Sequence, residues 1–197
     1  MIRQMINRKD EGTADIFICL VIIVCLLMVT LYSIQLRIAQ NEKYETDAAV
    51  IMAAESTLLM DLYQMSSTGE SVLDCTGNAY SNGIYENPAE ATRQACKIAY
   101  GRFKEHLMLD EHAYVTGMQL NEFTVYNVTE QAIYISTTYD GSSYTTEADT
   151  EFKTVKDVKG KERKITETSV YVDIRFTVEI FGRTYEIPIT EYVYGKV

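Results

Sequence analysis

The sequence is poor in several residue types on which common protein functions depend. Among its 197 residues there are two prolines, two histidines and no tryptophan. Two histidines leave little material for a histidine-based metal site or for acid–base catalysis by imidazole. Basic residues are outnumbered, with 18 Lys and Arg against 28 Asp and Glu, a formal net charge of −10. This charge argues against nucleic-acid binding, which requires a basic surface to displace counterions from phosphates.

The motifs of common active sites are also missing from the sequence. The ten glycines are scattered singly, so there is no glycine-rich loop of the kind that binds phosphates. No serine or cysteine has a plausible histidine partner for nucleophilic catalysis, and pairs of carboxylates are uninformative among 28 acidic residues. We therefore expect no catalytic residues, no enzymatic activity and no cofactor. The hydrophobic share of 47% nevertheless indicates a folded, globular part.

One long uncharged stretch lies near the N-terminus. Residues 16–34 read IFICLVIIVCLLMVTLYSI, nineteen residues without a charge. As an α-helix this stretch would measure roughly 28 Å, close to the thickness of the hydrocarbon core of a bilayer. A secretory signal peptide has a shorter apolar core of about 7–15 residues and then a small-x-small cleavage site, which is missing here. The stretch therefore predicts a single membrane span.

The charges on either side of the span bear on its orientation. Residues 1–15 contain Arg3, Arg8 and Lys9, whereas Arg37 and Lys43 follow the span. By the positive-inside rule this distribution weakly favours a cytoplasmic N-terminus. Three acidic residues balance the three basic ones in residues 1–15, so the whole net charge of −10 belongs to the part beyond. We expect a single-pass protein of the cell membrane whose acidic C-terminal domain is extracellular.

The span lies within the longest stretch of the chain without glycine or proline. This stretch comprises the 56 residues between Gly12 and Gly69, and apolar residues recur at helical spacing beyond the span. The pattern predicts one continuous helix, about 75 Å long for roughly 50 residues. The alternative is a break near residues 35–42. We expect a short basic cytoplasmic leader over residues 1–12, the long helix over residues 13–65 and an exported domain over residues 66–197.

The beginning of the chain resembles the type IV pilin-like families. A short basic leader ending in Arg8-Lys9-Asp10-Glu11-Gly12 is followed at once by Thr13-Ala14-Asp15-Ile16-Phe17 and the apolar helix. The resemblance is greatest to the minor pilin or pseudopilin subunits of tight-adherence (Tad) systems and covers about residues 1–60. In these families a prepilin peptidase cuts after the glycine. The resemblance implies that Gly12 precedes the cut, that Thr13 becomes the new N-terminus and that the helix assembles with other pilin-like subunits.

One position departs from the pilin pattern. The families have a glutamate five residues after the glycine, where this chain has Phe17, and the only acid nearby is Asp15. In those families the carboxylate pairs with the amino group of a neighbouring subunit. Asp15 could make this assembly contact, because it lies near the positive end of the helix dipole. It could equally be an ordinary helix residue in the headgroup region, in which case the protein is an uncleaved anchor.

The remaining chain predicts an α+β domain. Asn87-Pro88-Ala89-Glu90 is a strong helix start, with Asn as the N-cap, and this helix should run to about residue 109. Apolar and polar residues then alternate, most clearly over residues 168–180. Pro188 has no N–H, which indicates an edge strand or a bulge. The expected fold class is α+β, a long N-terminal transmembrane helix that continues into a domain with one further helix and an antiparallel sheet of about five or six strands. Strands are expected over residues 114–119, 122–129, 131–138, 151–158, 168–180 and 183–194.

The four cysteines divide by location. Cys19 and Cys25 lie in the apolar span, where we expect small buried hydrophobes. Cys75 and Cys96 lie in the proposed exported domain, where an even pair is the usual material for a disulfide. The bond would close a loop of about twenty residues and contribute roughly 3 kcal/mol. The alternative is a pair of thiols.

Three further features have an ordinary interpretation. His106 and His112 are six residues apart, which places them on different faces of a helix, so we expect no metal ligands. A basic run around Gly160 could touch anionic headgroups or cell-wall polymer, although a solvated hairpin tip is the default interpretation. The triplet at Asn127 matches a glycosylation sequon inside a predicted strand. The basic run consists of Lys153, Lys156, Lys159, Lys161, Arg163 and Lys164.

Two functions stay open on the sequence alone. The first is a pilin-like minor subunit of a bacterial type IV or Tad-type pilus or secretion fibre. Its partners would be membrane lipid, other pilin-like subunits and a prepilin peptidase. The second is an uncleaved, single-pass membrane-anchored module that binds a partner or wall component outside the cell.

Overall fold

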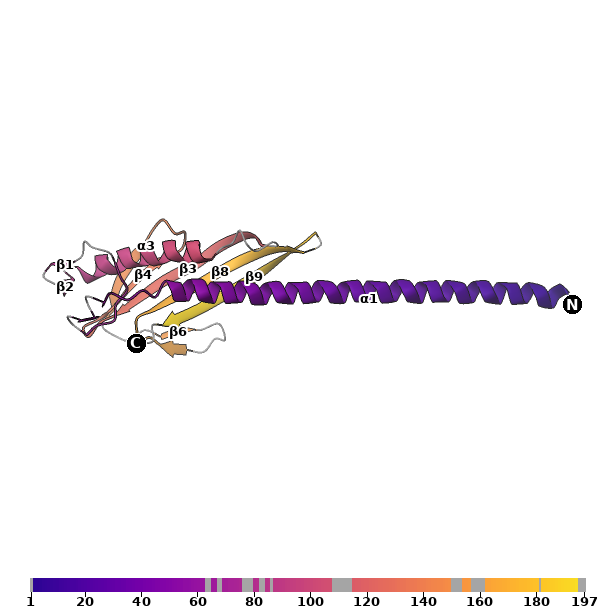
Figure 1. Cartoon of the computed structure of the whole chain (residues 1–197), viewed down its shortest axis with the longest axis horizontal. Coiled ribbons are helices and arrows are strands. Elements are labelled where there is room, and N and C mark those ends of the chain that lie inside the picture. Colours follow the sequence, from indigo (N-terminus) through magenta and orange to yellow (C-terminus); the bar gives the residue numbers. More distant parts are fainter. Residues whose placement is uncertain are drawn as a thin grey trace. The chain divides into compact units, whose positions relative to one another are not determined.

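The computed structural model describes residues 2–62, 65–66, 69–75, 80–81, 84–85, 87–107, 115–149, 154–156, 162–180 and 182–194. The chain divides into two compact units, Met1–Glu42 and Lys43–Val197. The first unit is the N-terminal part of helix α1 (Ile2–Ser56). The second unit comprises the end of α1, helix α3 (Pro88–His106) and all of the strands (Figure 1).

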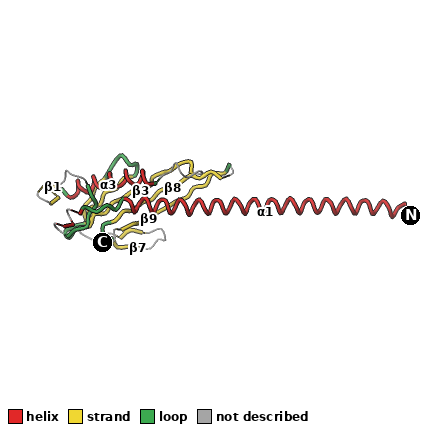
Figure 2. Tube along the Cα trace, in the orientation of Figure 1, coloured by secondary structure: helices red, strands yellow, loops and turns green. Residues whose placement is uncertain are grey.

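Helix α1 is continuous from Ile2 to Ser56, and Figure 2 draws it as one uninterrupted coil. The break considered near residues 35–42 does not occur, because that stretch holds neither glycine nor proline. The helix differs from the expected range at both ends, since it includes residues 2–12 and stops at Ser56 instead of 65. At its end the Ser56 and Thr57 hydroxyls each donate a hydrogen bond of 2.6 Å, to the Ala53 and Ala54 carbonyls. These bonds satisfy two of the last helix carbonyls.

Helix α3 begins where the sequence predicts. Asn87 is the N-cap, and its Oδ1 accepts a hydrogen bond of 3.2 Å from the backbone N–H of Glu90. Pro88 occupies the first turn, where its missing N–H costs nothing. The helix ends at His106, three residues earlier than expected. One side of α3 is buried, formed by Ala91, Thr92, Ala95, Cys96, Ala99, Tyr100 and Phe103.

The main sheet has five antiparallel strands in the order β5-β4-β3-β8-β9, so the predicted α+β fold class is confirmed. Figure 1 shows α3 lying along this sheet. Strand β9 is an edge strand and contains Pro188, as its missing N–H predicts. The strands are β3 (Val115–Val128), β4 (Ile133–Thr138), β5 (Thr145–Asp149), β8 (Ser169–Ile180) and β9 (Arg183–Tyr194).

The expected separation of strands 114–119 and 122–129 is wrong. Both belong to the 14-residue strand β3, whose pairing with β8 shifts register between Leu120 and Glu122. A bulge of this kind bends a strand without ending it, which alternation alone does not reveal. Two short hairpins accompany the sheet, β1 (Tyr80–Ser81) with β2 (Ile84–Tyr85), and β6 (Thr154–Lys156) with β7 (Glu162–Lys164).

The two faces of the main sheet have different environments because successive side chains point to opposite sides of a strand. The covered face carries Phe123, Val125 and Val172, which share one buried cluster with α3 and with Val50, Ala53 and Ala54 of α1. The open face carries a smaller buried cluster to which none of the described helices contributes. That second cluster consists of Tyr126, Ile133 and Ile135 with Ile165, which follows β7.

Candidate functional site

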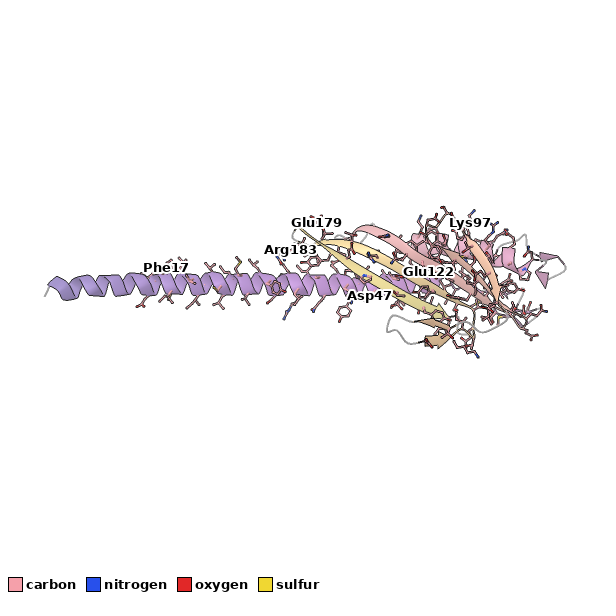
Figure 3. All side chains as sticks on the ribbon, turned by 180° about the vertical axis from the view of Figure 1, so that it is seen from behind. Phe17, Asp47, Lys97, Glu122, Glu179 and Arg183 are labelled. Carbon is pink, nitrogen blue, oxygen red and sulfur yellow. The ribbon has the colours of Figure 1, made fainter. Side chains whose placement is uncertain are left out.

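The most prominent candidate site is the apolar segment of α1, residues 16–36. Its large apolar side chains are all exposed, from 43% at Val21 to 69% at Ile16. Figure 3 shows side chains projecting from this part of the helix, where Phe17 is labelled. They occupy nearly every position, so the apolar surface surrounds the helix instead of forming one stripe. This helix is long and apolar enough to cross a membrane, with a mean hydropathy of 2.9 over its best window.

The polar side chains within the apolar segment are satisfied locally. The hydroxyl of Thr30 donates a hydrogen bond of 2.8 Å to the Leu27 carbonyl, and the hydroxyl of Ser33 donates one of 2.8 Å to the Val29 carbonyl. In hydrocarbon no water can satisfy such groups, so bonds within the helix are the suitable arrangement. These contacts agree with the membrane span predicted over residues 16–34.

The residues assigned to processing and assembly lie at the N-terminal edge of the apolar segment. Gly12 and Thr13 are both within α1, and Asp15 is exposed one residue before the apolar run. A peptidase that cut between Gly12 and Thr13 would have to unwind this turn, and glycine is the residue that weakens a helix most after proline. The assigned roles of Gly12, Thr13 and Asp15 stay predictions.

The end of α1 is part of the core of the second unit. Val50, Ala53 and Ala54 are fully buried at 0% exposure. Alanines allow a helix backbone to approach a sheet closely, and the two alanines here are one turn below Val50. The domain is therefore built around this part of the helix and does not merely follow it.

Two carboxylates lie where the end of α1 packs against the sheet. Burial raises the pKa of Asp47 on α1, although nearby Lys43 acts in the opposite direction. Burial and then the charge of Asp47 raise the pKa of Glu191 on β9. The mutual repulsion of these side chains opposes the packing of the helix on this strand. Among 28 acidic residues, no feature of the sequence distinguishes this pair.

Cys75 and Cys96 both belong to the buried cluster of the covered face, each as a thiol. The Cys96 thiol donates to the Ser136 carbonyl at 3.3 Å, and burial raises its pKa to about 12. A thiol held in its protonated form is a poor nucleophile. The predicted disulfide is not formed in this structure and stays a prediction. Cys19 and Cys25, expected to be buried, are exposed on the apolar segment, where lipid or another helix would cover them.

Within the part of the chain that the structure describes, the remaining candidates from the sequence do not come together in a site. His106 is exposed in the last turn of α3, and His112 lies outside the described residues. The basic run falls on hairpin β6–β7, and its tip around Gly160 also lies outside the described residues. Asn127 is buried, where it accepts a hydrogen bond from the Leu73 N–H and donates one to Thr92 Oγ1. This structural role leaves the sequon at Asn127 inaccessible to glycosylation.

Sequence reasoning missed a small pocket on the open face. It has a volume of about 210 Å³ and lies between β3, β4 and β5. Glu122, Tyr126 and Thr137 contribute to its wall, from two adjacent strands. In the sequence, the alternation of apolar and polar residues along β3 and β4 shows only that these three residues belong to one face of a sheet.

Comparison of the chain with protein-family models, with curated proteins and with solved structures finds no match.

Proposed function

We propose that the protein is a pilin-like minor subunit of a bacterial Tad-type or type IV pilus or secretion fibre. In this proposal α1 anchors the subunit in the membrane with its N-terminus in the cytoplasm, and the second unit is exported. Prepilin peptidase removes residues 1–12. The apolar segment then packs against the corresponding segments of other pilin-like subunits.

The observation that carries the proposal is the unbroken helix α1. It combines an apolar surface that surrounds the helix with a terminal part that belongs to the core of the exported domain. A simple anchor needs only about 20 apolar residues and tolerates any linker after them. Here the helix that carries the apolar segment continues without a linker into the core of the domain.

The resemblance around Gly12 provides the test of the proposal. The full chain is expressed with and without a prepilin peptidase, and its intact mass is measured. We expect a species that begins at Thr13 only when the peptidase is present, and we expect Gly12→Ala to abolish it. Gly101→Ala is the matched control, because Gly101 lies in α3 with nothing within 4 Å of an added Cβ. An intact Met1 under all conditions would contradict processing.

A second experiment tests assembly separately from cleavage. Asp15→Asn removes the charge at the edge of the apolar segment and leaves Gly12 and Thr13 intact. We expect normal cleavage but loss of the subunit from sheared surface fibres, measured by immunoblotting. Asp10→Asn, which changes a charge inside the leader, is the control. Normal incorporation of the Asp15→Asn subunit would show that this carboxylate makes no assembly contact.

The alternative is an uncleaved, membrane-anchored binding module with the same orientation. The pocket on the open face favours it, because a subunit whose only task is assembly has no need for one. The mass experiment separates the two, since only the pilin-like subunit loses residues 1–12.

A further inference from the structure

The pocket on the open face contains a buried hydroxyl without a partner. Tyr126 is only 5% exposed, and its ring packs against Tyr192 with the centroids 6.5 Å apart. None of the residues that the structure describes forms a hydrogen bond with its hydroxyl group. Buried polar groups are nearly always hydrogen-bonded, because an unsatisfied one carries its full desolvation cost. The hydroxyl of Tyr126 is therefore available to a ligand that enters the pocket.

The charge around this hydroxyl is negative. Glu122 and Glu147 both line the pocket, and no lysine, arginine or histidine is present among its described lining residues. Burial of the ring, and to a smaller extent the negative charge of Glu122, raise the pKa of Tyr126, so its hydroxyl stays neutral. Figure 3 labels Glu122 on the sheet. A cation is the ligand type that this environment favours.

The hydrogen bonds among side chains at the pocket leave some oxygen atoms with unused lone pairs. Thr124 Oγ1 donates to Glu122 Oε1 at 2.7 Å and is 2.9 Å from Thr137 Oγ1. Because Thr124 uses its proton for Glu122, Thr137 is the donor in the second bond, and lone pairs of Thr137 stay available. The second oxygen of Glu122 and the oxygen of Tyr126 are acceptors as well. These acceptors suit a group with several donors.

We propose that this pocket binds a primary ammonium group on a short alkyl chain. A primary ammonium has three donors and no acceptor, which suits the acceptors among the residues that line this pocket. The volume of about 210 Å³ is below the roughly 300–1,000 Å³ of pockets for larger organic ligands. A quaternary ammonium has no N–H to donate. Calcium takes about 6–8 oxygen ligands and is the competing cation against which the binding experiment is controlled.

The same chemistry has two sources outside the cell, the lysine side chain of another protein chain and a free alkylamine. The site is independent of the proposed pilin-like function, since all of its residues lie on the open face and none lies on α1. An assembled subunit and a simple anchor could both use it. Failure of peptidase cleavage would leave this proposal standing, and failure of amine binding would leave the pilin-like proposal standing.

Binding is measured by NMR on the full chain in detergent micelles with ¹³C-labelled tyrosine. The probes are n-butylammonium chloride and Nα-acetyl-lysine N-methylamide, compared with tetramethylammonium, guanidinium and calcium chlorides. We expect saturable shifts of Tyr126 with the two primary amines and weaker effects with the other cations. Tighter binding of the lysine derivative assigns a protein source, and tighter binding of butylammonium assigns a free amine.

Variants then test the two central residues. Glu122→Gln removes the charge and should weaken butylammonium binding about tenfold, and Tyr126→Phe should weaken it several-fold. Glu179→Gln is the matched control, because Glu179 is an exposed carboxylate that Figure 3 draws well away from Glu122. Thermal unfolding of each variant verifies the fold, and Glu147→Gln replaces Glu122→Gln if the latter does not fold. Each of four results would overturn the proposal. The first two are butylammonium binding that does not saturate and tetramethylammonium binding with equal affinity. The other two are calcium binding that is tighter than butylammonium binding, and an unchanged affinity for butylammonium in folded Tyr126→Phe.

Discussion

The two faces of the sheet are made by the same strands, yet their roles differ. On β8, Val170, Val172 and Ile174 are fully buried on the covered face. The alternate residues Tyr171 and Asp173 are only partly buried on the open face. Apolar burial, the main source of stability, is therefore concentrated on one face. The other face presents tyrosine, threonine and carboxylate groups, and Glu122, Tyr126 and Thr137 line a pocket there.

The largest effect is expected from a cavity on the covered face. Phe123 is fully buried and contacts the rings of Tyr100 and Phe103, with centroids 5.3 and 5.5 Å away. Phe123→Ala should lower the free energy of unfolding by about 3–5 kcal/mol, because it removes apolar contacts and leaves a void. Urea unfolding of the full chain in detergent, followed by tyrosine fluorescence, measures this loss.

The matching substitution on the exposed surface should have almost no effect. Tyr139, just after β4, is 60% exposed. Tyr139→Ala should change the free energy of unfolding by less than about 0.5 kcal/mol. Equal losses from the two aromatic residues would contradict the assignment of stability to the covered face.

The next largest effect is expected in the loop after β4. Gly141 has φ +72°, and a Cβ added to it would clash with Cε1 of buried Tyr100. Gly141→Ala should cost about 2–4 kcal/mol, from the left-handed backbone and from displacement of the ring. The same urea experiment measures it.

Gly182 separates these two contributions. Its φ is +71°, almost the same, but nothing lies within 4 Å of an added Cβ. Gly182→Ala should therefore cost only about 1–2 kcal/mol, the backbone contribution alone. If both alanine variants lost the same stability, contact with Tyr100 would have no part in the effect.

A smaller loss is expected from the polar group buried on the covered face. The Asn127 side chain connects Leu73 N–H, at 3.0 Å, with Thr92 Oγ1, at 3.1 Å. Asn127→Ala leaves the buried N–H without its acceptor and should cost about 2 kcal/mol. Asn127→Asp retains an acceptor and is the comparison. A loss below that of Tyr139→Ala would show that water replaces the amide.

The sequence predicted those parts of the fold that depend on local chemistry. The N-cap Asn87, the edge position of Pro188 and the alternation of β8 each follow from one residue type or one period. The end of α1 at Ser56 was not predicted, because helix formers continue beyond it and the hydroxyl bonds that close the helix depend on local geometry. The bulge in β3 was not predicted, because the pairing with β8 that keeps its two halves in one strand cannot be read from the sequence of β3 alone.

For the candidate sites as well, features set by consecutive residues were predicted and features set by strand pairing were not. The apolar segment was predicted from composition, because membrane span length is a property of consecutive residues. The pocket on the open face was not, because Glu122 and Thr137 come together only through the register of β3 with β4. At Asn127 the sequence shows only a sequon inside a predicted strand, whereas the structure shows the two hydrogen bonds that its side-chain amide makes.

A small stabilisation is expected at Glu191, a carboxylate on the covered face. Burial and the charge of Asp47 raise its pKa above the ordinary value of 4.5, so the folded state binds this proton more readily than the unfolded state. Stability should therefore increase as pH falls from neutral through the raised pKa, with no further gain from this group below 4.5. Glu191→Gln should stabilise the domain by about 0.5 kcal/mol at pH 7, the scale of a solvent-screened charge, and flatten this dependence.

Urea midpoints between pH 7 and pH 5 measure the effect of Glu191→Gln. Glu186→Gln on the same strand is the control, because exposed Glu186 accepts a hydrogen bond of 3.2 Å from Arg175 and its removal should give no stabilisation. A Glu191→Gln variant that is less stable than the parent at pH 7 would mean that this carboxylate holds α1 to the sheet. The stability of the covered face would then come from a polar contact as well as from apolar burial. The two faces of the sheet would differ less in the kind of interaction that they use.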